Sequence, residues 1–532
     1  MSGTASAPTP GAALPEFKQI LGHPGPLWML FMSEFWERFA FYGIRWALVL
    51  YIVAQFYGGN SAGEADANLT YGSYLALVYA GAIFGGYVAD RVIGYQRSIL
   101  VGAVFMAAGL FMIAYPDPSV FKLGLATVIV GNGLFKPNIS TMVGKLYAAG
   151  DMRRDSGFTI FYMGINLGGF LAPIFTQILA ERVFGTEAMP SYKMVFYASG
   201  IGMLISLVWF HFGRAQLQGI GAPPADAQGL KRTLYVIVGA VLTIPAIYFL
   251  MGGGFARIVA DALIGLGLME PTLVNGLIDY QKTLPAATVL AWVLALMFIG
   301  LAFMLLMEGI RNGAVARDKV IAMLIIFTFN IMFWMFFEQA GSSFTFLAEK
   351  IVDREMFGWT FPVAWFQSVN SLAIIVLAPI VAWIWVVMGS RNPSIPRKFG
   401  LGLLFNGLAF LLLMFALSKL LDDKSMIPFW TLFMVYVIQS VGELCLSPIG
   451  LSMVTKLAPL RLVGFGMGGW FLSTGIGNNL SGIFASHVSG TGGMTANSAL
   501  SGYTFGFWSL MIAGGVLFIG APLLNKLLHG VK

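Results

Sequence analysis

The chain has 532 residues, of which 58% are hydrophobic and only 10% are charged, and its formal net charge is +7. Soluble proteins carry about 25% charged residues, so the composition predicts a polytopic α-helical membrane protein. The positive charge does not indicate nucleic-acid binding, because the basic residues lie mostly in short loops between apolar runs. The single cysteine, Cys445, excludes an intramolecular disulfide.

Apolar runs long enough to cross a bilayer, which takes roughly 20 residues, recur along most of the chain. Residues 1–26 precede them and are small, polar and Pro-rich, which predicts a disordered tail. We count fourteen runs, at about 28–56, 71–93, 98–115, 121–146, 155–181, 193–213, 233–252, 286–310, 315–347, 360–388, 397–418, 427–456, 461–487 and 500–528.

The seventh and eighth runs contain no charged residue before Glu308, as expected of helices that face lipid. We expect the Gly-rich segment between them to lie at the outer surface. The remaining twelve form two sets of six, which predicts the major facilitator fold, with a substrate site near the midplane between two bundles. The predicted domains are a six-helix bundle over 27–213, a linker with an accessory transmembrane hairpin over 214–310, and a six-helix bundle over 311–532.

The orientation follows from the basic residues in the loops. Of the 31 Lys and Arg, 19 fall in or beside one alternate set of loops and 9 in or beside the other, and the remaining 3 are Arg38, Arg45 and Lys136. Because cytoplasmic loops are enriched in Lys and Arg, we expect both termini to be cytoplasmic.

The first run carries a stripe of polar and charged residues. Glu34, Glu37, Arg38, Tyr42 and Arg45 fall within one sector of roughly 140° of a helix. A charge near the bilayer centre costs at least about 2.5–3.5 kcal/mol, so this face must look into protein or a wet cavity. One alternative is a structural ion-pair ladder that holds helices together.

Other runs carry isolated polar or aromatic residues. Lys136 precedes Pro137, which can kink the helix there. Such interruptions recur at transporter binding sites. The further candidates, each of which could instead be a buried polar or packing residue, are Tyr162 and Asn166, Trp334 and Glu338, Asn370, Glu443 and Ser447, and Trp470.

Matching the depths of these charges predicts two gate pairs. Arg45 and Glu338 both fall in the outer half of their runs, whereas Lys136 and Glu443 fall at or below the middle. Each pair would join one bundle to the other, one pair nearer each face. Alternating access requires two such closures that do not break together, which argues against an open channel.

Two stretches carry a family resemblance. Glu34-x-x-Glu37-Arg38-Phe-Ala-Phe41-Tyr42-Gly43 resembles the ExxERFxYYG signature of the proton-dependent oligopeptide transporter (POT/PTR) family, with Phe41 in place of the first tyrosine. Asp151 to Gly168, which reads DMRRDSGFTIFYMGINLG, resembles the second signature of that family. The resemblance extends roughly from Pro24 to Leu528, and the two additional central helices are similar to those of bacterial members.

The resemblance implies a proton-coupled symporter of the plasma (inner) membrane that imports di- and tripeptides by alternating access. A dipeptide carries opposite charges about 5–6 Å apart, and charge-assisted bonds to both ends would fix its orientation. The family pattern implies that Arg38, Arg45 and Lys136 face the peptide carboxylate and that Asn166, Asn370 and Glu443 face its amino terminus. The residues implied to line side-chain pockets are Tyr42, Tyr79, Tyr162, Trp334, Ser447 and Trp470.

Proton coupling must rest on carboxylates, because all four histidines lie near helix ends or in loops. The candidates are Glu34 and Glu37 beside Arg38, with Glu338 as a further site. A peptide carboxylate bound to Arg38 or Arg45 would partly neutralise that guanidinium and make a glutamate easier to protonate. Peptide and proton would then bind cooperatively.

Two other functions compete with this one. An anion transporter of the same fold, such as a nitrate transporter, is disfavoured by the retained ExxER stretch. A membrane-embedded enzyme is disfavoured because the chain has no HExxH motif, no histidine cluster and no nucleophile–base pair that we recognise. We expect small peptides, protons and the lipid bilayer as partners, no nucleic acid, no cofactor or metal, and function as a monomer.

Overall fold

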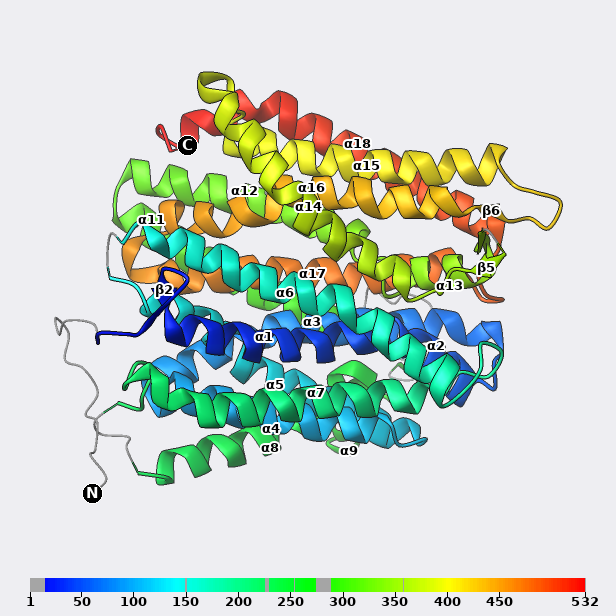
Figure 1. The fold of residues 1–532 in the computed structure, drawn as a ribbon, viewed down its shortest axis with the longest axis horizontal. Coiled ribbons are helices and arrows are strands. Elements are labelled where there is room, and N and C mark those ends of the chain that lie inside the picture. The colour runs from blue at the N-terminus through cyan, green and yellow to red at the C-terminus, as the bar shows by residue number, and fades with distance from the viewer. Residues whose placement is uncertain are drawn as a thin grey trace. The chain divides into compact units, whose positions relative to one another are not determined.

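We describe the protein from a computed structural model, over residues 15–148, 151–224, 229–252, 254–273, 289–356 and 358–531. Within these ranges, twelve helices are long and apolar enough to cross a membrane, or thirteen with the bent pair at the start of the chain. The thirteenth predicted run forms α17 (Val463–Ser489), which does not count among these twelve because its Gly, Ser and Asn residues make it less apolar. The predicted all-α polytopic fold is confirmed (Figure 1).

The chain forms two compact units, Met1–Ala47 with Gly81–Met251 and Leu48–Ala80 with Gly252–Lys532. In the first unit α1 packs against α6 and α7, and α4 packs against α5 and α7 (Figure 1). Its helices of ten or more residues are α1 (Gly25–Arg45), the end of α3 (Glu64–Val88), α4 (Tyr95–Ile113), α5 (Pro118–Lys145), α6 (Arg153–Ile178), α7 (Tyr192–Gly213) and α8 (Lys231–Gly252).

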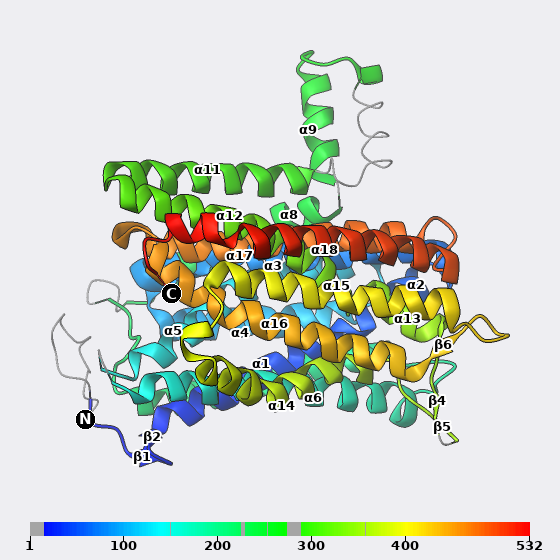
Figure 2. The ribbon, with the colours of Figure 1, turned by 90° about the horizontal axis from the view of Figure 1, so that it is seen from above.

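In the second unit α12 packs against α11 and α17, and α15 packs against α16 and α18 (Figure 2). Its other helices are α2 (Ala47–Phe56), the start of α3, α9 (Gly254–Gly265), α11 (Val289–Arg311), α12 (Ala314–Phe337), α13 (Ser343–Lys350), α14 (Trp365–Val387), α15 (Ile395–Lys419), α16 (Phe429–Leu457) and α18 (Ala496–Leu527). These units group Leu48–Ala80 with the C-terminal helices, so the predicted bundle boundaries stay a prediction.

In the part of the chain described here, the strands are two residues long and lie in the segments before or between the helices. In the second unit β3 (Val352–Asp353) pairs in parallel with β6 (Ile427–Pro428), and β4 (Glu355–Met356) pairs antiparallel with β5 (Trp359–Thr360). Neither sheet contributes a predicted site residue.

The end of the predicted tail is structured rather than disordered. Strands β1 (Gln19–Ile20) and β2 (His23–Pro24) form an antiparallel hairpin. The buried His23 Nδ1 lies 2.8 Å from the Tyr147 hydroxyl, at the end of α5. The composition of this segment did not reveal these contacts with residues distant in the chain. The first fourteen residues of the predicted tail lie outside the described residues.

Two predicted runs are broken at points where side chains form hydrogen bonds with other helices. The first run bends by 43° between α1 and α2, immediately after Arg45. There the Trp46 indole donates to Thr176 Oγ1 at 3.0 Å. The ninth run, predicted as one helix over 315–347, ends as α12 at Phe337 and resumes as α13. Between them Gln339 donates to Ser481 Oγ at 3.0 Å and accepts from Ser343 Oγ at 2.6 Å.

The segment predicted between the accessory helices is described only in part. It contains α9, followed by residues up to Leu273. The surface position predicted for it rests partly on residues 274–288, which lie outside the described residues.

Small residues set the close helix contacts that hold the first unit around α1. A Cβ at Gly168 of α6 would lie 2.7 Å from the Phe35 carbonyl oxygen and 3.0 Å from Arg38 Cβ. A Cβ at Gly164, one turn earlier, would lie 2.9 Å from the Phe31 ring. Larger residues at these positions would push α6 away from the charged stripe. Gly164 and Gly168 therefore serve the packing of α6 against α1.

A buried carboxylate ties three segments of the second unit together. Glu64, at the start of α3, is fully buried and forms an ion pair with Lys350 at the end of α13. Its other oxygen accepts the Met494 backbone N–H at 2.8 Å, in the loop before α18. Lys350 also donates to Ser61 Oγ at 2.8 Å. Because a buried charge must be paired, this cluster fixes one end of the unit.

Candidate functional site

The charged stripe of α1 is buried and paired. Glu34 is 1% exposed, Glu37 is 0% exposed and Arg38 is 3% exposed. Arg38 donates to both oxygens of Glu37, from Nε to Oε2 and from an Nη at 2.6 Å to Oε1. Its Nε lies 3.4 Å from Glu34 Oε1. The prediction that these three residues share one face is confirmed. The Arg38 guanidinium lies between the carboxylates of Glu34 and Glu37.

Helix α5 brings two further polar residues to this cluster. Asn132 Nδ2 donates to Glu37 Oε1 at 3.1 Å, and Asn132 is fully buried. Lys136, one turn later, has its ammonium 5.9 Å from the centre of the Phe41 ring, and the Arg38 guanidinium carbon lies 4.7 Å from the same ring. Phe41 therefore contacts both cations, and cation–π attraction helps to hold them side by side.

The remaining first-unit candidates lie on α1 and α6. Arg45 is the last residue of α1, and its guanidinium carbon lies 5.7 Å from the centre of the Tyr42 ring. Asn166 is buried and donates to the Tyr162 carbonyl oxygen at 2.9 Å. Tyr162 and Asn166 thus occupy successive turns of one face of α6.

The second unit brings Asn370 and Glu443 together. Asn370 Nδ2 donates to Glu443 Oε2 at 3.1 Å and to Ser440 Oγ at 2.9 Å. The amide lies on α14 and the carboxylate on α16, so this hydrogen bond connects two helices. Both residues are partly exposed.

Trp334 and Glu338 lie at the end of α12. The Trp334 indole donates to Asn330 Oδ1 at 3.0 Å, and Asn330 in turn donates to Ser473 Oγ of α17 at 2.8 Å. Glu338 is 6% exposed and follows the last residue of α12. Its carbonyl oxygen accepts from Ser481 Oγ at 2.9 Å.

The other three candidates of the second unit are Tyr79, Ser447 and Trp470. Tyr79 is partly buried on α3, and a Cβ at Gly475 would lie 3.6 Å from its Cβ. Ser447 Oγ is buried and has no hydrogen-bond partner among the described residues. Trp470 is 4% exposed and packs edge-on against Phe327 and Phe399, as a core residue would. Its predicted pocket role is untested.

Comparison with known proteins assigns the family. The model of the POT family matches residues 96–497, which is most of the chain. The chain belongs to the POT family.

Relatives of similar length support the assignment of this POT-family chain. A peptide transporter of Yersinia enterocolitica, YePEPT, is 34% identical over 91% of this chain and 90% of its own length. Dipeptide and tripeptide permease A of Yersinia pestis is 35% identical over 86% of this chain and 82% of its own. The uncharacterized transporter YclF of Bacillus subtilis is 32% identical over 97% of both chains.

Solved structures agree with the fold of the POT-family protein. A crystal structure of a mutant of the peptide transporter POT in complex with alafosfalin has a TM-score of 0.76, with 30% identity over 96% of this chain and 97% of that one. A POT family transporter in complex with 5-aminolevulinic acid has a TM-score of 0.75, with 27% identity over 96% of this chain and 98% of that one. The chain is therefore a multi-pass membrane transporter.

The two predicted gate pairs each take one residue from each compact unit of the POT-family chain. Arg45 and Lys136 belong to the first unit, and Glu338 and Glu443 belong to the second. Both pairs therefore stay predictions.

Three polar residues of the site escaped the sequence analysis. Asn132 lies four residues before Lys136, and Asn330 lies four residues before Trp334. This spacing places each on the same helix face as a predicted site residue, so it could have revealed them. Ser440 lies three residues before Glu443 in the same way.

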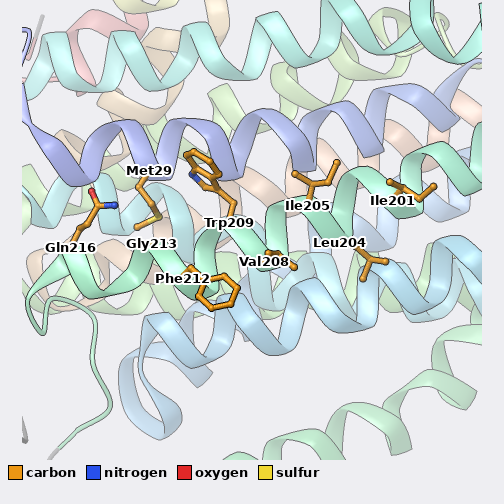
Figure 3. A pocket seen from close by; sticks show the side chains of 9 residues that line it. All are labelled: Met29, Ile201, Leu204, Ile205, Val208, Trp209, Phe212, Gly213 and Gln216. Atoms are coloured by element: carbon orange, nitrogen blue, oxygen red, sulfur yellow. The ribbon is translucent and has the colours of Figure 1, made fainter. Parts of the chain in front are cut away.

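Among the described residues of the POT-family chain, no metal cluster adds to this site, and an apolar groove is lined by other residues. No group of three or more His, Cys, Asp or Glu could hold a metal ion. A groove of about 530 Å³ runs along α7 and is lined mostly by apolar residues, among them Ile201, Val208 and Phe212 (Figure 3). It contains no predicted site residue, and its exposed apolar walls suit contact with lipid.

We predict that the buried ion pair of this POT-family protein matters far more to stability than an exposed pair of the same kind. Arg38→Met should leave Glu34 and Glu37 buried without their cation, and losing one partner of a buried pair costs about 3–5 kcal/mol. The apparent Tm in detergent should therefore fall clearly.

The matched control is Arg317→Met. Arg317 also bonds through Nε and an Nη to the neighbouring carboxylate, Asp318, but its side chain is 48% exposed. Surface pairs contribute about 0–1 kcal/mol, so this change should lower the apparent Tm little. Equal decreases for the two variants would contradict the buried charge cluster described here.

Proposed function

We propose that this chain is a proton-coupled symporter that imports di- and tripeptides by alternating access. The observation that carries the proposal is the buried Arg38 guanidinium between Glu37 and Glu34. A peptide carboxylate and a glutamate carboxylate are both ligands for one guanidinium. The same cation can therefore respond to the peptide and to the proton.

The proton and the peptide act on this pair in turn. Protonation of Glu37 neutralises its carboxylate and weakens both bonds from Arg38. The guanidinium is then available to the carboxylate of an incoming peptide. Since each event favours the other, their binding is cooperative, and the coupling is reciprocal. Glu34 and Glu338 are the further carboxyl groups that we assign to the proton path.

The two ends of the peptide need opposite charges, and the two units carry them. Arg38, Arg45 and Lys136 of the first unit are the groups for the carboxylate. Glu443 and Asn370 of the second unit, hydrogen-bonded to each other at 3.1 Å, and Asn166 of the first are the groups for the amino terminus. Tyr42, Tyr79, Tyr162, Trp334, Ser447 and Trp470 are the proposed side-chain contacts.

The names of the relatives support a peptide substrate. Two of them are a peptide transporter and a dipeptide and tripeptide permease. The structural neighbour bound to 5-aminolevulinic acid holds a ligand whose amino and carboxylic acid groups correspond to the two ends of a peptide. We assign the chain to the plasma (inner) membrane, acting as a monomer, with the proton as its coupling ion and no cofactor or catalytic residue.

Uptake into proteoliposomes tests the proposed function. We expect the purified chain to accumulate a labelled dipeptide such as Ala-Ala when the outside is more acidic than the inside. Unlabelled di- and tripeptides should compete with the labelled dipeptide for uptake. Free alanine should not compete, because it is too short to reach both the residues proposed for the carboxylate and those proposed for the amino terminus. Nitrate uptake under the same gradient without dipeptide uptake would show the anion transporter instead.

We assign Arg45 and Glu338 to the outer gate and Lys136 and Glu443 to the inner gate. Reversing the charges of Arg45 and Glu338 tests the outer gate. Each single reversal, Arg45→Glu or Glu338→Arg, places like charges together and should abolish uptake. The double reversal restores an opposite pair and should recover part of it. A double variant no better than the worse single variant would show that the two residues do not pair.

Labelling from outside tests the proposed topology, in which both termini are cytoplasmic. Single cysteines are placed at Ser61 and Ser394 in a chain without Cys445. An impermeant thiol reagent added to intact cells should label the first position and not the second, because loops alternate between the two sides. Labelling of the second position alone would reverse the orientation.

A further inference from the structure

Asn132, on α5, forms a side-chain hydrogen bond with Glu37 on α1. Its Nδ2 donates to Glu37 Oε1 at 3.1 Å, and both residues are 0% exposed. The same oxygen also accepts from Arg38 at 2.6 Å. The carboxylate thus receives one neutral donor from α5 beside the charged donors from its own helix.

The chemistry of the two groups decides which amide atom faces Glu37. An ionised carboxylate can only accept hydrogen bonds, so an amide that contacts it must present its N–H. In the described chain the other amide atom, Asn132 Oδ1, is buried and has no partner. A buried acceptor without a partner is unfavourable. The residue therefore bears this cost while it supplies a donor to Glu37.

The flanking glycines explain why the amide reaches α1. A Cβ at Gly131 would lie 2.6 Å from the Gly102 carbonyl oxygen, and a Cβ at Gly133 would lie 3.0 Å from the Gly81 carbonyl oxygen. Helix α5 is thus pressed against α4 on one side and α3 on the other. Asn132 lies on the remaining face, one turn before Lys136.

We propose that Asn132 is a positioning residue for proton coupling, whose N–H holds the Glu37 carboxylate ionised on Arg38 until the transported proton arrives. The proposal rests on the proposed function, because it assigns Glu37 to the proton path. A hydrogen bond to a charged acceptor is stronger than one to a neutral acceptor. The amide therefore favours the carboxylate over the carboxylic acid and sets how acidic the outside must be.

Among the described residues, the charged groups that act on the neighbouring Glu34 are Glu37 and Arg38 on α1 and Lys136 on α5. Tyr42 on α1 acts electrostatically on Arg38. Residues 157–178 and 194–213, which form most of α6 and α7, contain no Asp, Glu, Lys or Arg. When the proton arrives it bonds to a Glu37 oxygen, Arg38 keeps its own proton, and the ion pair between them is lost. Asn132 takes no proton at any stage.

The pH dependence of uptake tests this role, with Asn132→Leu as the variant. Leucine has a similar shape and no donor, so Glu37 should be protonated at a lower proton concentration. We expect the pH of half-maximal proton-driven dipeptide uptake to rise by about one unit, a tenfold change in proton affinity. Exchange of labelled for unlabelled dipeptide without a gradient should persist, because it needs no net proton movement.

Asn138→Leu is the matched control. Asn138 is also fully buried on α5 and also has an unpartnered Oδ1, but its Nδ2 donates to the Gly85 and Leu134 carbonyl oxygens. Its removal should leave the pH of half-maximal uptake unchanged. If Asn132→Leu does not yield folded protein, Asn132→Ala removes the same donor with less bulk and should give the same shift.

Three results would overturn the proposal. They are a pH profile of the Asn132 variant equal to that of the parent, a shift to lower pH, and a shift that Asn138→Leu reproduces. Loss of exchange together with uptake would show a purely structural role and would overturn it as well. Failure of the parent protein to show proton-driven uptake would instead refute the proposed function, so the two failures are distinguishable.

Discussion

The charge of Arg38 constrains the rest of the structure. A guanidinium that is 3% exposed inside a membrane-spanning helix must be balanced by carboxylates, and Glu37 and Glu34 supply them on the same helix. The neighbouring helices serve this arrangement. Gly168 lets α6 approach Arg38, and Asn132 extends from α5 to Glu37. Because two carboxylates surround one guanidinium, a proton or a competing carboxylate can change which of them pairs with Arg38. Such an arrangement suits transport better than a purely structural ion pair.

The two compact units carry complementary chemistry. The first holds Arg38, Arg45 and Lys136, with Phe41 in contact with two of these cations. The second holds Glu443 bonded to Asn370, and Glu338 where α12 ends. The helix interruptions lie beside two of these charges, because α1 ends at Arg45 and α12 ends just before Glu338. An interruption next to a charge is a natural place for a helix to bend as a transporter changes state.

Much of this could be predicted from the sequence, because membrane helices depend on local composition. The apolar runs became helices, and the spacing of Glu34, Glu37 and Arg38 placed them on one face. The features that the sequence analysis did not predict have a common cause. At the breaks after Arg45 and Phe337, Trp46 and Glu338 bond to Thr176 and Ser481, which are distant in the sequence. Asn132 bonds to Glu37, which lies more than ninety residues earlier in the chain. A single sequence does not show that two such distant residues are in contact.

The most direct test of the account is to replace Glu37 by glutamine, which keeps the shape of the side chain but cannot titrate. If the Glu37–Arg38 pair couples proton and peptide, Glu37→Gln should lose accumulation of labelled dipeptide driven by an inward proton gradient. It should retain exchange of labelled for unlabelled dipeptide, which needs the binding site and both gates but no net proton movement. Accumulation by the variant as strong as that of the parent protein would contradict the account and remove Glu37 from the proton path.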